Sequence, residues 1–169
     1  AHGYREVGQE YLQNVLDTAK QLDAYDSGRI YYYLGEYQKA YLALDEARDK
    51  GGADSYLYLG RAYAATGDYN YASSVYNNYL SKQGPNAEIY NELGLCEMAK
   101  KEYQNALAAF QAGKQIEGNS LMQTLCFNEI VAYEYLEDYQ QAEILMNAYL
   151  QNYPDDQTAI REQQFLSTR

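Results

Sequence analysis

Histidine occurs once in this 169-residue sequence, at position 2. A Ser-His-Asp triad, a Cys-His pair and a histidine metal site each need that side chain beside other reactive groups, and His2 lies at a chain end where we expect fraying. Neither a GxxxxGK(S/T) nor a GxGxxG phosphate-binding motif is present, and Gly51-Gly52 is typical of a loop. These absences argue against most nucleophilic enzymes and against nucleotide binding, so we predict no enzyme, no cofactor and no metal site.

Basic residues are also scarce. Thirteen lysines and arginines stand against 24 aspartates and glutamates, which gives a formal net charge of −11. Residues 115–160 contain eight acidic residues and no basic one. Such a surface repels phosphate backbones and anionic lipid, so we exclude nucleic acid as a partner. No apolar run approaches the roughly 18 residues that a membrane span needs, so we expect no membrane insertion.

Cysteine and proline each occur only twice. Cys96 and Cys126 have neither CxxC nor metal-pair spacing. Their helical offset of about six residues, roughly 9 Å, disfavours a disulfide, so we expect two buried, inert thiols. No linker rich in proline, glycine or serine interrupts the chain, which predicts a single domain over residues 1–169.

A four-fold recurrence is the strongest positive signal. The pattern is an acidic residue, Tyr, an amide residue (Asn or Gln), any residue, and Ala. It occurs at 36–40, 68–72, 102–106 and 138–142, with Tyr spacings of 32, 34 and 36 residues. A period in this range is typical of stacked supersecondary units. Apolar residues spaced by threes and fours precede and follow each Tyr, so each unit is predicted to be a helical hairpin.

Small residues and turn residues fit this hairpin. Gly60 and Ala72 are small where two antiparallel helices must approach closely. Asp68 can accept hydrogen bonds from the free N–H groups that open a second helix, and Gly35 and Gly67 can end a first helix in the left-handed conformation. Residues 101 and 137 stand where those glycines were but are Lys and Glu, so we expect less favourable turns there.

The sequence resembles the tetratricopeptide repeat family, whose pattern is an aromatic residue, Leu-Gly, Tyr, and later Ala, an aromatic residue and Pro. Residues 53–86 fit best. The matching positions are Tyr56, Leu59, Gly60, Tyr63, Ala72, Tyr76 and Pro85 in that unit; Tyr90, Leu93, Gly94, Ala106 and Phe110 in the next; Gly28, Tyr31, Ala40 and Leu44 in the first; and Tyr133, Ala142, Met146 and Pro154 in the last.

This resemblance implies an all-α superhelix of four hairpins over 21–52, 53–86, 87–122 and 123–155. Leu12, Leu16, Ala19 and Leu22 predict an N-terminal packing helix at 4–20. A capping helix at 156–168 would be opened by the aspartates at 155 and 156 and would cover the end of the stack with Ile160, Phe165 and Leu166.

Tryptophan is absent, phenylalanine occurs three times and tyrosine 22 times, so Tyr must supply the aromatic packing. In the run at 31–33 we expect Tyr31 in the core and Tyr32 and Tyr33 facing a groove. A stacking platform for bases is the alternative, but the net charge opposes it.

The family resemblance implies a concave groove, lined by the first helices, that holds a peptide segment of a partner. The corresponding positions are Tyr25, Asp26, Arg29, Tyr32, Tyr33, Leu57, Tyr58, Arg61, Ala64, Asn91, Glu92, Leu95, Met98, Phe127, Asn128, Val131, Glu134 and Tyr135. Chaperone-binding members clamp a terminal carboxylate with Lys and Asn. That set is broken here, with Tyr25 and Leu57 where Lys or Asn is needed and with Ala65 and Ala99 further along, so chaperone tails are disfavoured.

The two arginines, Arg29 and Arg61, occupy equivalent positions among tyrosines and suit a carboxylate. The alternative is that they pair internally with Asp26 or Glu92. The more apolar C-terminal half would offer a patch around Leu95, Phe127 and Val131.

We therefore predict a non-catalytic protein-interaction scaffold. A self-assembling structural protein is one alternative. Another is an enzyme that uses Glu97 and Glu129 as paired carboxylates, although a two-residue insertion before the last unit favours an exposed Glu129. The sequence begins Ala-His-Gly rather than with Met, and it is rich in Tyr, Asn and Gln. That composition suits a surface-anchored extracytoplasmic protein, as in bacterial lipoproteins with such repeats, with a cytoplasmic location as the other possibility.

Overall fold

The computed structural model describes residues 2–169, apart from the side chains of His2 and Arg5. Ten helices and no strand form this part of the chain, so the all-α prediction is confirmed. The chain divides into two compact units, residues 1–83 and 84–169, which we call unit 1 and unit 2 and describe separately. The predicted single domain over the whole chain stays a prediction.

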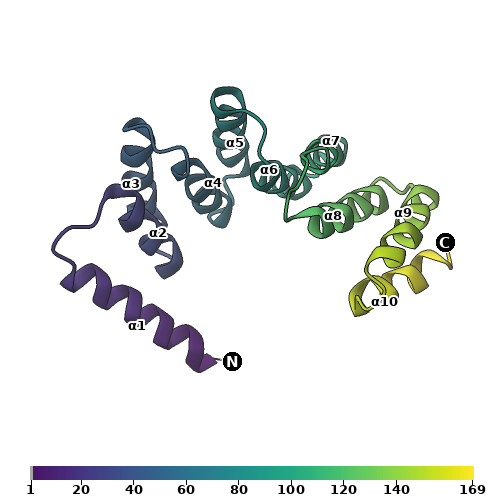
Figure 1. Cartoon of the computed structure of the whole chain (residues 1–169), viewed down its shortest axis with the longest axis horizontal. Helices are drawn as coiled ribbons and strands as arrows, with labels where there is room; N and C mark the ends of the chain where they lie inside the picture. The colour runs from purple at the N-terminus through teal and green to yellow at the C-terminus, as the bar shows by residue number, and fades with distance from the viewer. Residues whose placement is uncertain (1) are drawn as a thin grey trace. The chain divides into compact units, whose positions relative to one another are not determined.

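Unit 1 is built from two helical hairpins and a preceding helix (Figure 1). Its helices are α1 (His2–Thr18), α2 (Ala24–Leu34), α3 (Tyr37–Asp49), α4 (Ser55–Ala65) and α5 (Tyr69–Gln83). The hairpins are α2–α3 and α4–α5; α3 also packs against α4, and α1 contacts α2. The first hairpin lies within the predicted range 21–52 and the second within 53–86.

Unit 2 repeats this arrangement and ends in a single helix. Its helices are α6 (Ala87–Ala99), α7 (Tyr103–Lys114), α8 (Met122–Tyr135), α9 (Tyr139–Asn152) and α10 (Gln157–Leu166). The hairpins are α6–α7 and α8–α9; α7 packs against α8, and α10 packs against α9. No described helix is long and apolar enough to cross a membrane.

Three of the four hairpins close around a glycine of the first helix, and α8 of the fourth hairpin has none. A Cβ atom on Gly60 would lie 2.3 Å from the ring of Tyr76, and one on Gly94 would lie 2.3 Å from the ring of Phe110. Both rings come from the second helix of the same hairpin and are fully buried. Any side chain at these glycines would push the two helices apart, so the close approach predicted at Gly60 is confirmed.

The turn inside each hairpin needs one residue in the left-handed conformation. Gly35 and Gly67 adopt it with φ of 79° and 84°. Lys101 and Glu137 take the same role with φ of 64° and 60°. The less favourable turns predicted there are thus observed, because this conformation costs a residue with a Cβ atom roughly 1–2 kcal/mol.

The second helices begin at an acidic residue. The Asp68 carboxylate accepts a hydrogen bond of 3.0 Å from the backbone N–H of Tyr71, and Asp138 accepts one of 3.1 Å from Gln141. These bonds satisfy N–H groups that the first helical turn leaves without a partner. The predicted capping role of Asp68 is confirmed.

The two end helices differ in how well they are covered. In α10, Ala159 and Leu166 are buried, whereas Phe165 is 40% exposed, so the prediction that Phe165 covers the end of the stack is wrong. The same prediction is confirmed for Leu166, which belongs with Ala159 to the core of unit 2, and Ile160 is half-buried. In α1, Leu12 and Leu16 are half-buried as expected, but Ala19 lies beyond the helix and is exposed.

We predict that Lys101→Gly and Glu137→Gly each stabilise the protein. Glycine removes the left-handed strain but loses more freedom on folding, so the net gain in free energy of unfolding is up to about 1 kcal/mol. Urea denaturation followed by far-UV circular dichroism measures it. Gly35→Ala, the reverse change in an equivalent turn, should lower stability; a loss of stability in both glycine variants would contradict this account of the turns.

Candidate functional site

The first helices of unit 1 bring two arginines to one tyrosine ring. The Arg29 guanidinium carbon lies 5.2 Å from the ring centre of Tyr25 and 5.1 Å from that of Tyr58. The Arg61 guanidinium carbon lies 5.6 Å from the same Tyr58 ring. Cations at these distances are attracted to the ring face. Residues predicted from two repeats therefore meet around Tyr58, and we call Tyr25, Arg29, Tyr58 and Arg61 the Arg–Tyr cluster.

Two further tyrosines border this cluster. The Tyr32 and Tyr33 rings make edge contacts with Tyr58 at 5.7 Å and 5.9 Å between centroids. The Tyr33 and Tyr58 hydroxyls are 3.1 Å apart, within hydrogen-bond distance, and Tyr33 is half exposed. Tyr31 and Tyr32 are both half-buried against the unit 1 core, so the expected division that put only Tyr31 in the core is wrong. Tyr32 is large enough to contact the core and the cluster together.

Internal pairing of Arg29 is weak. Its nearest carboxylate oxygen, on Asp26, is 3.8 Å away, and the two side chains are 39% and 53% exposed. An ion pair of this length and exposure contributes little to stability. Both tyrosine rings lie against the guanidinium, and 39% of the Arg29 side chain stays exposed.

The first helices of unit 2 present a different face. The Asn128 amide donates a hydrogen bond of 2.9 Å to Asn91, which is buried. Phe127 packs edge-on against Tyr149 with ring centroids 5.7 Å apart. Most of the remaining predicted residues there are apolar: Leu95 and Tyr135 are exposed, and Met98 and Val131 are half-buried.

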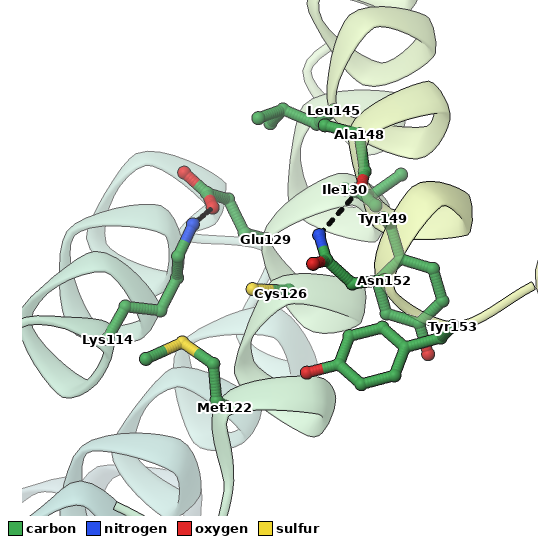
Figure 2. A pocket seen from close by; sticks show the side chains of 10 residues that line it. All are labelled: Lys114, Met122, Cys126, Glu129, Ile130, Leu145, Ala148, Tyr149, Asn152 and Tyr153. Carbon is green, nitrogen blue, oxygen red and sulfur yellow. Dashed lines mark hydrogen bonds and ion pairs between the residues drawn. The ribbon is translucent and has the colours of Figure 1, made fainter. Parts of the chain in front are cut away.

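A pocket lies on the other side of α8. Its volume is about 320 Å³, and it is lined by Lys114, Met122, Cys126, Glu129, Ile130, Leu145, Ala148, Tyr149, Asn152 and Tyr153. Figure 2 shows an ion pair on one side of this space and two tyrosine rings on the other. We call it the outer pocket. Sequence analysis missed it, because its walls come from three helices and carry no recognisable motif.

A buried ion pair forms one wall of the outer pocket. The Lys114 ammonium contacts one carboxylate oxygen of Glu129, and Gln111 donates a hydrogen bond of 2.9 Å to the other. Burial works against the ammonium, but the hydrogen bond and charge of Glu129 outweigh it and raise the pKa of Lys114. Glu129 is only 5% exposed, so the expectation that the insertion exposes it is wrong. Lys114 makes burial of this carboxylate possible.

The proposed carboxylate pair does not share a site. Glu97 forms its own ion pair with Lys100 at 2.7 Å, and the outer pocket beside Glu129 is lined by other residues. Each carboxylate thus has its own lysine as counter-ion, Lys100 for Glu97 and Lys114 for Glu129. Among the described residues, no group of three His, Cys, Asp or Glu side chains is placed to hold a metal ion.

The cysteines are both free thiols. Cys96 is buried, and burial raises the pKa of its thiol to about 12. Cys126 is only partly buried because it faces the outer pocket, so the expectation of two buried thiols holds for Cys96 and fails for Cys126. Burial also raises the pKa of the Cys126 thiol, with the Lys114 charge opposing the shift.

This arrangement of hairpins is typical of helical-repeat proteins, the class that the fold defines. A family model described as the tetratricopeptide repeat matches residues 25–70 and 59–119, more than half of the sequence. The chain belongs to the tetratricopeptide repeat family, as the sequence pattern predicted. A comparison with curated proteins finds no match.

Solved structures show the same fold. TTC0263, a thermophilic protein of this family from Thermus thermophilus, has a TM-score of 0.74 and 16% identity over 100% of this chain and 93% of its own. A chain of the Cut9–Hcn1 hetero-tetramer of the APC/C has a TM-score of 0.70 and 19% identity over 97% of this chain and 33% of its own. MamA of AMB-1 has a TM-score of 0.68 and 21% identity over 95% of this chain and 81% of its own. Identities this low establish the fold alone.

We predict that Glu129→Ala destabilises the protein by about 3 kcal/mol, because it leaves the Lys114 ammonium partly buried without its carboxylate. Thermal and urea unfolding measure the loss. The double variant Lys114→Met/Glu129→Leu removes both charges and should recover most of the stability. Equal losses in the two variants would show that packing, rather than the uncompensated charge, sets the penalty.

We predict a pH effect on stability from Glu134. Burial of this carboxyl, and to a lesser extent the neighbouring Glu162, raises its pKa from 4.5 to about 7. Between these two values the unfolded state has lost its proton while the native state keeps it, so stability falls as pH rises. Glu134→Gln should raise stability at pH 8 by roughly 1 kcal/mol, given partial exposure, and change little at pH 4. Thermal melts across this range test it, with the exposed Glu117→Gln as control; a gain that does not depend on pH would contradict it.

Proposed function

We propose that this protein binds a peptide segment of a partner along its first-helix faces, as a non-catalytic scaffold. The tetratricopeptide repeat fold is that of protein-interaction scaffolds, and one structurally similar chain is part of the Cut9–Hcn1 hetero-tetramer. The observation that carries the proposal is the Arg–Tyr cluster, in which equivalent positions of two repeats place guanidinium groups around one ring.

The cluster suits a carboxylate of an acidic side chain or of a chain end. Guanidinium groups bind carboxylates through paired N–H donors, and two arginines one repeat apart can hold both oxygens of one group or two neighbouring groups. The tyrosine rings beside them would contact the apolar part of the same segment. In unit 2, Leu95, Phe127 and Val131 would bind apolar side chains, and the Asn91–Asn128 pair would offer a polar group to the peptide backbone.

A self-assembling structural role is the second candidate. Tyr4, Val7 and Tyr11 follow one face of α1 and are 65–90% exposed. Another copy of the chain could cover this stripe. Light scattering at two protein concentrations separates the candidates, because only self-assembly makes the measured mass rise with concentration. The surface-anchored extracytoplasmic location is likewise a proposal, supported by composition.

We predict that Arg29→Glu/Arg61→Glu abolishes capture of the partner while far-UV circular dichroism stays unchanged. The reversal replaces two attractive charges by repulsive ones at half-exposed positions, so the fold should tolerate it. A pulldown with the purified protein compares it with wild type. Lys39→Glu/Lys82→Glu, which makes the same charge change on second helices, should capture the partner normally; undiminished capture by the arginine variant would refute the assignment.

A further inference from the structure

The outer pocket lies opposite the face that carries the proposed function. At about 100° per residue along a helix, Cys126 and Asn128 point to nearly opposite sides of α8. Asn128 bonds Asn91 on the first-helix face, and Cys126 lines the outer pocket. Binding in the outer pocket and binding along the first helices therefore use different surfaces of unit 2.

The outer pocket has the size and lining for one large apolar side chain. Its volume of about 320 Å³ is at the small end of ligand-binding clefts. Met122, Ile130 and Leu145 supply aliphatic walls, and the rings of Tyr149 and Tyr153 form the opposite side (Figure 2). The polar wall is already neutralised, because Lys114 and Glu129 bind each other.

The segment that supplies most of the pocket lining is acidic. Residues 115–160, which supply every lining residue except Lys114, contain eight acidic residues and no basic one. Glu117 and Asp155 in this segment are exposed. Anionic ligands and acidic proteins are repelled from such a surface, whereas Lys and Arg side chains of a partner are attracted to it.

We propose that the outer pocket binds a basic amphipathic segment of another protein, which inserts one aromatic or long aliphatic side chain and places Lys or Arg around the rim. One buried anchor surrounded by complementary charge is a common mode of helix recognition. A second copy of this chain is a poor occupant, because each copy carries a net charge of −11. The proposal does not depend on the groove.

Ala148 offers a way to close the pocket without disturbing the core. It lines the pocket and is exposed on α9, so Ala148→Trp would fill the opening. Ala108→Trp makes the same change at an exposed position of α7 that does not line the pocket. Cys126 supplies a local reporter, since a side chain in the pocket would shield its thiol from alkylation.

The test selects a phage-displayed library of random 16-residue peptides on the wild-type protein, and the enriched peptides are then synthesised. We expect an aromatic or long aliphatic residue flanked by Lys or Arg. By fluorescence anisotropy these peptides should bind Ala148→Trp at least about tenfold more weakly than wild type or Ala108→Trp, and added salt should weaken binding. They should also slow iodoacetamide labelling of Cys126 at about pH 8.5, where more thiolate is present.

Arg29→Glu/Arg61→Glu should bind the same peptides as wild type does, which separates this site from the groove. The proposal is overturned if the library yields no enriched peptides, if those enriched lack basic residues, or if they bind Ala148→Trp as tightly as Ala108→Trp. Protection of Cys126 that rises with protein concentration, without any peptide, would overturn it in favour of a second copy as the occupant.

Discussion

The close approach of two helices within each hairpin is the constraint on which the rest depends. Gly60 and Gly94 each lie beneath an aromatic ring of the partner helix, at a distance that leaves no room for a Cβ atom. Gly28 does the same with Leu44 in the first hairpin, where a Cβ atom would lie 2.5 Å from the leucine. Because interiors resist even small increases in volume, this contact sets the spacing of these three helix pairs and hence which of their side chains face outward.

At this spacing, a helix pair keeps two sides whose side chains can contact a binding partner. On the first-helix side, unit 1 gathers cations and tyrosines around Tyr58, while unit 2 offers apolar residues beside an amide pair. On the other side of α8, the outer pocket is apolar and lies in an acidic segment. One small helical protein can thus present chemically distinct surfaces, since each helix of a hairpin faces solvent along part of its circumference.

Local signals were predictable from the sequence, and contacts between separate helices were not. The acidic caps, the left-handed turn residues and the hairpin glycines each act within one hairpin, so a motif of a few residues reveals them. The burial of Glu129 depends on Lys114, fifteen residues earlier on another helix, and no local pattern shows that partner. Cys126 is partly exposed for a related reason: three helices leave an open space beside it.

By itself, the sequence determined the class of structure: helix periodicity, small residues at a recurring interval and capping residues together allow only stacked hairpins. The acidic character also follows directly from composition. Only the tertiary structure decided that Arg29 and Arg61 share the Tyr58 ring, that Glu129 is neutralised and buried, and that α7, α8 and α9 enclose a pocket. Those outcomes depend on the distances between helices, which arise from packing of the whole unit rather than from any one segment.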